Sequence, residues 1–268
     1  MATPLEQKTN QKPVQFIVQR QDGPDGKAYD EAFEVPYRPN MNVISALMEI
    51  RRNPVNAAGE KTTPINWDMG CLEEVCGACS MVINGTPRQS CTALVDKLEQ
   101  PIRLQPMQTF PIVRDLQVDR QRMFDALKKV KAWVPIDGTY DLGPGPRMPE
   151  NKRQWAYELS KCMTCGVCLE ACPNVNDRSN FIGPASISQV RLFNSHPTGA
   201  FHKEDRLEAL MEDGGIMQCG NAQNCVEVCP KGIPLTTSIA AMNRQTTLHS
   251  FKKFFGSDEG RTGEAVSS

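Results

Sequence analysis

Eleven cysteines in two groups constrain this chain of 268 residues more than any other feature of its sequence. The first group lies within residues 71–91 and the second within residues 162–229, with no cysteine between them. An odd number of cysteines cannot pair off completely within one chain, and disulfides are rare in reducing compartments. The sequence therefore predicts that the cysteines bind metal.

The first group has the spacing of a plant-type two-iron ferredoxin site. Its members are Cys71, Cys76, Cys79 and Cys91. Three of them share a loop with Gly70, Gly77 and Ala78, whose small side chains let backbone amides approach the cluster sulfides. A structural zinc site is the alternative, but such a site normally uses two short Cys-x2-Cys pairs, and the second pair is absent here.

The second group begins with a bacterial ferredoxin run, Cys-x2-Cys-x2-Cys-x3-Cys-Pro, in which three cysteines bind one cluster and the fourth binds another. The cysteines of this run are Cys162, Cys165, Cys168 and Cys172. A partner run follows as a pseudo-repeat and contains Cys219, Cys225 and Cys229. Its missing cysteine would stand at position 222, which is Ala222.

Cross-ligation between the runs divides seven cysteines between two clusters. The set that predicts a 4Fe-4S cluster is Cys162, Cys165, Cys168 and Cys229. The set that predicts a 3Fe-4S cluster is Cys172, Cys219 and Cys225. Ala222 cannot bind iron, and a cubane that lacks one protein thiolate can lose the iron at that corner. Three thiolates therefore suit a cluster of three irons. The alternative is a four-iron cluster whose open corner takes water or another exogenous ligand.

The remaining residues predict an α+β protein. Strands are expected around residues 14–19, 33–37 and 80–83. The last of these leads into an Asn84-Gly85 hairpin turn, and a helix is expected to start at Asn42. The second half reads as mostly helical. Its last helix is predicted from about Leu235 to Phe255, with an apolar face that would serve core or subunit packing.

The domain organisation follows from these elements. Residues 14–117 are predicted to form a plant-type 2Fe-2S ferredoxin domain of the β-grasp type, and residues 118–256 an all-α, bacterial-ferredoxin-like domain. A helix with Met123, Phe124, Leu127 and Val130 on one face is expected just after this boundary. Residues 1–13 are expected to be an N-terminal tail and residues 257–268 a disordered one.

Several classes of function are not expected. Lysine and arginine number 30 against 31 acidic residues, so nothing indicates nucleic-acid binding. No apolar run reaches the roughly 18 residues of a membrane span, and no dinucleotide or Walker fingerprint is present. The three histidines, His196, His202 and His249, do not adjoin the cysteine groups, so no Rieske-type site is predicted. We assign no catalytic residue to this chain.

The order of these motifs resembles the iron-sulfur subunits of succinate dehydrogenases and fumarate reductases, the succinate:quinone oxidoreductases. The segment Phe110–Asp119 is similar to the one that joins the two domains in that family. The resemblance implies that electrons from the FAD of a flavoprotein subunit pass through the 2Fe-2S, 4Fe-4S and 3Fe-4S clusters to a quinone. It further implies a cytochrome b membrane anchor that holds the chain peripherally at the cytoplasmic side of the bacterial plasma membrane.

One departure from the family concerns the quinone. Where ubiquinone-reducing members have tryptophans and a histidine, this chain has the segment 174–177, Asn-Val-Asn-Asp, and Gly220. The chain therefore resembles the bacterial members that use menaquinone and a haem-bearing anchor, and no quinone-binding residue is assigned. Fumarate reduction in the reverse direction, the iron-sulfur subunit of another dehydrogenase and a free ferredoxin carrier remain alternatives.

Overall fold

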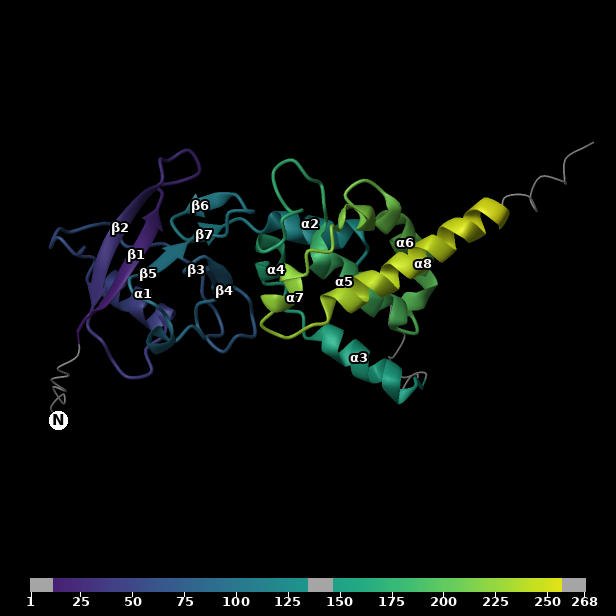
Figure 1. Ribbon diagram of the computed structural model, residues 1–268, viewed down its shortest axis with the longest axis horizontal. Helices are drawn as coiled ribbons and strands as arrows, with labels where there is room; N and C mark the ends of the chain where they lie inside the picture. The colour runs from purple at the N-terminus through teal and green to yellow at the C-terminus, as the bar shows by residue number, and fades with distance from the viewer. Residues whose placement is uncertain (1–11, 135–146, 257–268) are drawn as a thin grey trace, which may run out of the picture. The chain divides into compact units, whose positions relative to one another are not determined.

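The computed structural model describes residues 12–134 and 147–256, and these residues form two compact units (Figure 1). The first unit holds the described residues up to 120 together with residues 163–171. The second holds the described parts of 121–162 and of 172–268. The expected tail at 257–268, and all but two residues of the one at 1–13, lie outside the described residues.

A five-stranded mixed sheet is the framework of the first unit, with the strand order β2-β1-β5-β3-β4. The strands are β1 (Val14–Arg20), β2 (Tyr29–Val35), β3 (Ser80–Ile83), β4 (Thr86–Gln89) and β5 (Ile102–Gln105). Strand β1 runs antiparallel to β2 and parallel to the central strand β5, while β3 is antiparallel to both β4 and β5. This sheet confirms the prediction that the N-terminal domain is built on β-strands.

Alternation along β1 explains how the sheet buries one face. Val14, Phe16 and Val18 point into the core, whereas the residues between them are exposed or half-buried. Helix α1 (Val43–Arg52) contributes Ile44 and Leu47 to the same core cluster. The first unit therefore closes one hydrophobic core between the sheet and this helix.

The hairpin between β3 and β4 forms as predicted. Asn84 and Gly85 both have positive φ, 49° and 79°, as a two-residue Asn-Gly turn requires. The strand expected around 33–37 is shifted, because β2 begins at Tyr29 and ends at Val35. Pro36 follows directly and has no amide hydrogen to continue the ladder.

Four short elements complete the first unit, and a buried ion pair anchors the turn between two of them. They are η1 (Val95–Lys97), β6 (Ile112–Arg114), β7 (Gln117–Val118) and α4 (Val167–Glu170). Asp115, in the turn between β6 and β7, is 2% exposed and accepts from Nε of the buried Arg20 at 2.9 Å. This contact fixes the turn against the end of β1.

The second unit is helical, as predicted. Its elements are α2 (Gln121–Lys129), α3 (Glu150–Ser160), α5 (Gly183–Ser195), η2 (Gly199–His202), α6 (Lys203–Met211), η3 (Ile216–Gln218), α7 (Asn224–Glu227) and α8 (Leu235–Gly256). The long helix α8 packs against α5 and α6 (Figure 1). Among the helices that the structure describes, none combines the length and apolar character needed to cross a bilayer.

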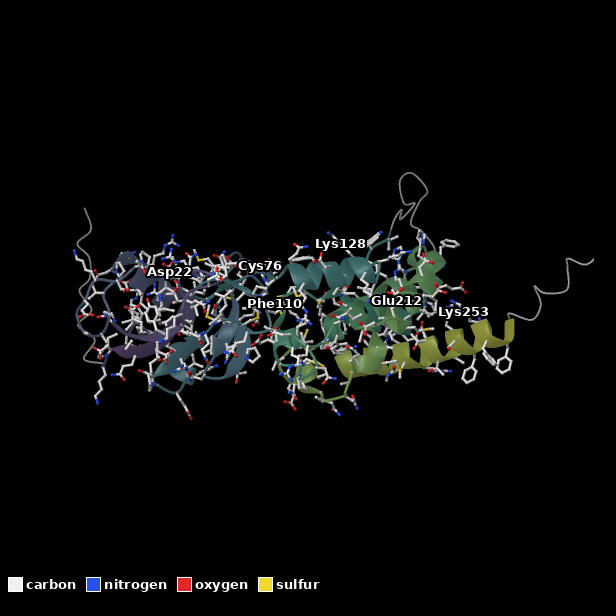
Figure 2. All side chains as sticks on the ribbon, turned by 90° about the horizontal axis from the view of Figure 1, so that it is seen from above. Asp22, Cys76, Phe110, Lys128, Glu212 and Lys253 are labelled. Atoms are coloured by element: carbon white, nitrogen blue, oxygen red, sulfur yellow. The ribbon has the colours of Figure 1, made fainter. Side chains whose placement is uncertain are left out.

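Two predicted helix faces need correction. In α2 the buried residues are Met123 and Ala126, and Val130 is buried directly after the helix, but Phe124 is exposed because it lies off this face. In α8, Leu248, Phe251 and Phe255 are exposed, so of the two predicted roles, core or subunit packing, this face does not serve the core of this chain. The face of α8 that is buried carries Ser238, Ile239, Met242 and Thr246. Figure 2 shows Lys253 on the last turns of the same helix.

Candidate functional site

All eleven cysteines lie within the described residues, and none of them forms a disulfide. In the described part of the chain, no three Cys, His, Asp or Glu side chains converge closely enough to hold a single metal ion. Thiolates of an iron-sulfur cluster bind several iron atoms separated by sulfides and are accordingly spread further apart. The absence of a single-ion site among the described residues is therefore compatible with cluster binding by each group of cysteines.

The loop that carries Cys71 and Cys76 folds its amides around sulfur. Sγ of Cys71 accepts from the backbone amides of Glu73, Val75 and Cys76 at 3.2–3.3 Å. Sγ of Cys76 accepts from the amide of Cys71 at 3.3 Å. This curvature places Leu72, Glu74 and Gly77 at positive φ. Non-glycine residues rarely adopt such values, so the loop is constrained to the shape that turns amides toward the sulfurs.

These amides favour the charged form of the exposed ligand. Hydrogen bonds from the amides of Glu73 and Val75 lower the pKa of the Cys71 thiol from its usual value of 9.0 to about 7. The thiolate is the form that binds iron. Cys71 is therefore prepared as a ligand near neutral pH by its own loop, which is exposed at the surface together with the Cys76 labelled in Figure 2.

The other two thiols of this group are buried. Cys79 precedes β3 and Cys91 follows β4, so the hairpin brings them together. Two causes raise the pKa of Cys91 to about 11: burial is the larger one, and the neighbouring Cys79 thiol is the next. Without a positive partner the Cys91 thiol stays protonated at neutral pH. Iron supplies that charge when a cluster binds, because a coordinating thiol loses its proton.

Backbone anchors hold both buried ligands. The carbonyl of Cys91 accepts from Nδ2 of Asn42 at 2.8 Å, and the carbonyl of Cys79 accepts from Oγ of Ser90 at 2.7 Å. Two exposed loop thiols and two buried thiols on a rigid hairpin form a donor set that fits a two-iron cluster.

The two ferredoxin runs share a backbone turn, which supports the pseudo-repeat independently of the cysteines. In the first run Thr164 and Gly166 have φ of 52° and 86°, on either side of Cys165. In the second run Asn221 and Gln223 have φ of 54° and 67°, on either side of Ala222. The second left-handed residue of each pair, Gly166 or Gln223, is the N-cap residue of a four-residue helix, α4 or α7. Ala222 thus stands on the same turn that presents a cysteine in the first run.

The cysteines predicted to hold the four-iron cluster are divided between the two units. Cys165 and Cys168 belong to the first unit, while Cys162 and Cys229 belong to the second. Cys168 is buried in α4, and the other three are half-buried. All four are thus less exposed than Cys71 and Cys76 of the two-iron loop.

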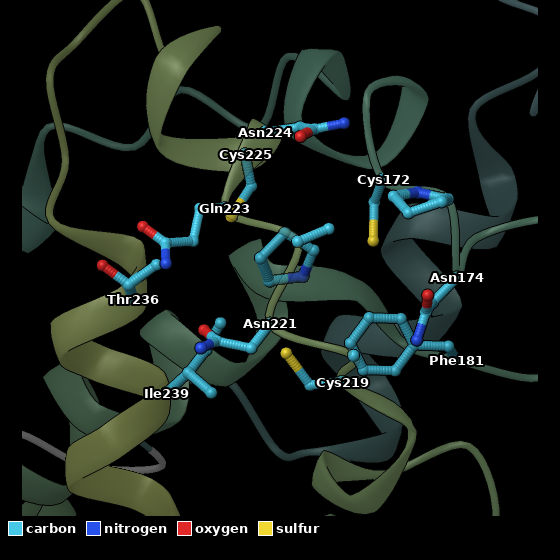
Figure 3. A pocket seen from close by; sticks show the side chains of 14 residues that line it. Cys172, Asn174, Phe181, Cys219, Asn221, Gln223, Asn224, Cys225, Thr236 and Ile239 are labelled. Atoms are coloured by element: carbon cyan, nitrogen blue, oxygen red, sulfur yellow. The ribbon is translucent and has the colours of Figure 1, made fainter.

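The remaining three cysteines line one pocket in the second unit (Figure 3). Cys172 approaches it from the end of the first run, and Cys219 and Cys225 flank Ala222 in the second. Burial, and then the nearby Cys172 and Cys219, raise the pKa of Cys225 to about 11. Burial likewise raises the pKa of Cys172. Three thiols that interact electrostatically and face the same hollow fit an iron-sulfur cluster with three protein ligands.

This pocket has an exposed side and an inner wall. Asn221, Ala222 and Gln223 are exposed, so the corner without a cysteine lies at the surface of the unit. The inner wall is formed by Phe181, Pro184, Thr236 and Ile239. These residues come from around α5 and α8, far from any cysteine in sequence, and no pattern in the sequence marks them as lining residues.

Other polar groups lie outside these sites. Nδ1 of His196 accepts from the amide of Gly199 at 3.2 Å, at the end of α5. His202 and His249 lie within 3.6 Å and 3.7 Å of Asp205 and Glu208. None of the three histidines lines the three-cysteine pocket. The side chain of His202 is exposed, whereas that of His249 is mostly buried against the helices.

Comparisons with known proteins agree with this description. Residues 15–125 match the family model of a 2Fe-2S iron-sulfur cluster binding domain, and residues 158–233 match that of a 4Fe-4S dicluster domain. The chain is 77% identical to the succinate dehydrogenase iron-sulfur subunit of Bacillus subtilis (strain 168), over 93% of this chain and 99% of that protein.

More distant relatives cover most of the chain as well. The fumarate reductase iron-sulfur subunit of Wolinella succinogenes is 30% identical over 82% of this chain and 90% of its own length. A chain of the Mycobacterium smegmatis Sdh1 complex in the apo form has a TM-score of 0.74 and 25% identity, over 90% of this chain and 98% of that one. The chain therefore belongs to the family of iron-sulfur subunits of succinate dehydrogenases and fumarate reductases.

Proposed function

We propose that this chain is the electron-relay subunit of a succinate:quinone oxidoreductase. Electrons would enter from the FAD of a flavoprotein subunit and leave to a quinone at a membrane anchor. The observation that carries the proposal is the pocket with three thiols, in which Ala222 occupies the turn that holds Cys165 in the first run. Three protein ligands distinguish this chain from carriers with two complete four-iron runs.

Each cluster has its own proposed ligands. The 2Fe-2S cluster would be bound by Cys71, Cys76, Cys79 and Cys91. The 4Fe-4S cluster would be bound by Cys162, Cys165, Cys168 and Cys229. The 3Fe-4S cluster would be bound by Cys172, Cys219 and Cys225. The clusters supply one-electron redox chemistry when bound. The protein holds them, excludes water and sets their potentials through hydrogen bonds and burial.

The surroundings of the ligands support different roles for the first and last sites. Amides surround the exposed Cys71, and such hydrogen bonds stabilise negative charge on sulfur. At the three-cysteine pocket the wall is mostly apolar and the corner at Ala222 is exposed. An exposed corner gives a partner subunit direct access to this cluster. The dicarboxylate chemistry would take place on the flavoprotein, because no acid-base site is assigned here.

Menaquinone is the quinone we favour. Asn174 opens the segment 174–177, where ubiquinone-type members have tryptophans; its Nδ2 donates to the carbonyl of Gln218, and it lines the cluster pocket. Gly220 lies against this amide, since a Cβ at Gly220 would come within 3.1 Å of Nδ2. The anchor would be a haem-bearing cytochrome b that holds the chain at the cytoplasmic side of the bacterial plasma membrane.

Electron paramagnetic resonance of the native complex tests the whole proposal. Spectra are recorded on the air-oxidised, succinate-reduced and dithionite-reduced complex from membranes. We expect a 3Fe-4S signal in the oxidised state, which succinate replaces by a two-iron signal. Clusters that do not respond to succinate would move the function to another dehydrogenase or a free carrier, and a preparation without any iron signal would contradict it entirely.

Fumarate reduction is the second candidate because the Wolinella succinogenes relative is a fumarate reductase subunit. The same complex is assayed for succinate oxidation with a menaquinone analogue and for fumarate reduction with the corresponding quinol. A faster forward reaction would favour the dehydrogenase. A faster reverse reaction would assign the reductase while leaving the three-cluster relay intact.

A further inference from the structure

Within the first unit, the two-iron loop touches the segment that carries Cys165. Gly77, between Cys76 and Cys79, has φ of +72° and is buried. A Cβ added at Gly77 would lie 2.7 Å from Cβ and 2.8 Å from Cα of Cys165, and 3.1 Å from the carbonyl of Met163. Only glycine leaves room for these two loops to meet at their backbones.

A buried serine ties the same two loops together. Oγ of Ser80 lies 2.9 Å from the carbonyl of Gly77 and 2.9 Å from the carbonyl of Cys165, so its hydroxyl can donate to either one. Nε2 of Gln89 donates to this oxygen at 2.9 Å and fixes its orientation. Nη1 of Arg120 donates to the carbonyl of Gly77 at 2.7 Å. The contact is therefore a saturated polar network as well as a steric fit.

The far end of this segment is anchored separately. The carboxylate of Glu170 accepts from the amides of Gln108 and Thr109 at 2.9 Å and from Oγ1 of Thr109 at 2.6 Å. Residues 163–171 are thus held to the first unit at both ends. The position of Cys165 relative to the two-iron loop is determined by contacts within one compact unit.

We propose that Gly77 and Ser80 are positioning residues for electron transfer between the first two clusters. They set the separation between the two-iron site and the Cys165 corner of the four-iron site, and the Gly77–Ser80–Cys165 contact is the route between them. In this step the two-iron site is oxidised by one electron and the four-iron site is reduced by one. No proton or leaving group moves. This inference depends on the cluster assignment proposed above.

The physical reason is the steep distance dependence of electron tunnelling and of magnetic coupling between paramagnetic centres. Backbone atoms in van der Waals contact, joined by hydrogen bonds, give a shorter route than side chains separated by a gap. A substitution that forces the loops apart should therefore weaken both properties while leaving all eleven cysteines in place.

Gly77→Ala is the first test, with Gly85→Ala as its matched control. Both glycines have positive φ, +72° and +79°, so both variants carry the same kind of backbone strain. A Cβ at Gly85 meets nothing within 4 Å, whereas the one at Gly77 meets Cys165. In the dithionite-reduced complex we expect Gly77→Ala to lose part of the magnetic splitting between the two-iron and four-iron signals. Gly85→Ala should retain it. Equal splitting in both variants would overturn the proposal.

Ser80→Ala is the second test and avoids the steric clash, so it remains informative if Gly77→Ala fails to assemble its clusters. Its control is Ser195→Ala in α5, which also removes a buried hydroxyl that donates to a backbone carbonyl, that of Leu192. We expect only Ser80→Ala to reduce the splitting, to slow the loss of the oxidised 3Fe-4S signal on addition of succinate, because those electrons pass the four-iron site, and to accelerate hydrogen exchange of the amides in 163–168.

The outcomes separate this inference from the proposed function. If the wild-type complex lacked the two-iron or four-iron signal, the cluster assignment would fail. If the wild type showed both signals and Ser80→Ala matched Ser195→Ala in splitting, reduction rate and exchange, the assignment would stand and the positioning role of Ser80 would be rejected.

Discussion

Single residues give the sulfurs of this chain very different surroundings. Cys71 lies in an exposed loop whose amides stabilise negative charge, whereas Cys91 and Cys225 are buried beside other thiols. A cluster ligand must be deprotonated, so these surroundings determine how each cysteine behaves when iron is absent. At the same scale, one methyl group at Ala222 occupies the position of a ligand.

Ala222→Cys is expected to convert the three-iron centre to a four-iron cluster. The new thiol would stand on the same left-handed turn that presents Cys165 in the first run, and a fourth thiolate would lower the potential of the terminal centre. Redox titration followed by electron paramagnetic resonance measures both effects. Ala222→Ser is the matched control, because a hydroxyl of similar size should leave the 3Fe-4S signal in place. An unchanged signal in Ala222→Cys would contradict our account of this position.

Cys71 is expected to be the more reactive thiol when iron has been removed. Its pKa of about 7 lies below the ordinary 9.0, so the thiolate predominates above pH 7, while Cys91, with a pKa of about 11, stays protonated to much higher pH. Iodoacetamide labelling followed by mass spectrometry should show half-maximal rate for Cys71 near pH 7. Cys91 should label slowly at pH 8. Equal rates at that pH would show that the loop amides do not control the thiol.

At the scale of elements, the end of helix α1 holds a cluster ligand in place. The N-terminus of α1 is closed by a capping box, in which Oδ1 of Asn42 accepts from the amide of Ser45 and Oγ of Ser45 accepts from the amide of Asn42. Asn42 also donates to the carbonyl of Cys91. One side chain therefore stabilises a helix and positions a cluster ligand.

Asn42→Ala should destabilise the two-iron site more than Ser45→Ala does. Loss of the cap costs about 0.5–2 kcal/mol, and the carbonyl of Cys91, left without its donor, costs about 1–3 kcal/mol more. Ser45→Ala removes the capping box but keeps the contact with Cys91. Guanidinium denaturation followed by the visible absorption of the clusters measures the difference. Equal midpoints for the two variants would mean that the contact with Cys91 contributes nothing.

The paired turns at α4 and α7 make a second prediction at this scale. If the runs exchange their last ligands, Cys229→Ser should disturb the 4Fe-4S cluster although Cys229 lies in the second run. Cys225→Ser, four residues earlier, should disturb the 3Fe-4S cluster instead. Electron paramagnetic resonance distinguishes the two signals. Damage by Cys229→Ser confined to the 3Fe-4S signal would reject cross-ligation.

Across the whole first unit, a buried ion pair connects segments that lie far apart in the sequence. Arg20 at the end of β1 is 1% exposed and contacts Asp115, Glu31 and both oxygens of Thr63. Asp115 also accepts from the amide of Asn66 at 2.9 Å. The pair thereby holds the segment that leads out of the two-iron domain against the sheet.

Arg20→Met is expected to destabilise the first unit by about 3–5 kcal/mol, because it leaves Asp115 buried without its cation. Arg103→Met is the control. Arg103 contacts both carboxylate oxygens of Asp30, at 2.8 and 3.0 Å, but the pair is exposed, so its loss should cost about 1 kcal/mol or less. Thermal melting followed by the two-iron signal compares the variants. A smaller loss in Arg20→Met than in Arg103→Met would contradict the importance of this buried pair.

The sequence by itself determined the features that depend on local spacing. The turn at Asn84-Gly85, the start of α1 at Asn42 and the extent of α8 all follow from residues near in the chain. The division into a stranded two-iron half and a helical half follows as well. Each half is marked by its own cysteine spacing and by the strand or helix patterns around it, and both are local properties of the sequence. The absence of a cysteine at Ala222 is likewise visible in the sequence.

Only the tertiary structure decided which surfaces and long-range contacts these elements use. An apolar helical pattern cannot tell core from exposed surface: Phe124, expected on one face with the buried Met123, is exposed, and Phe251, expected in core or subunit packing, lies outside the core. The contact between Gly77 and Cys165 joins residues 88 positions apart, and Arg20 meets Asp115 across 95. Such contacts depend on how the whole chain packs, so no local pattern in the sequence encodes them.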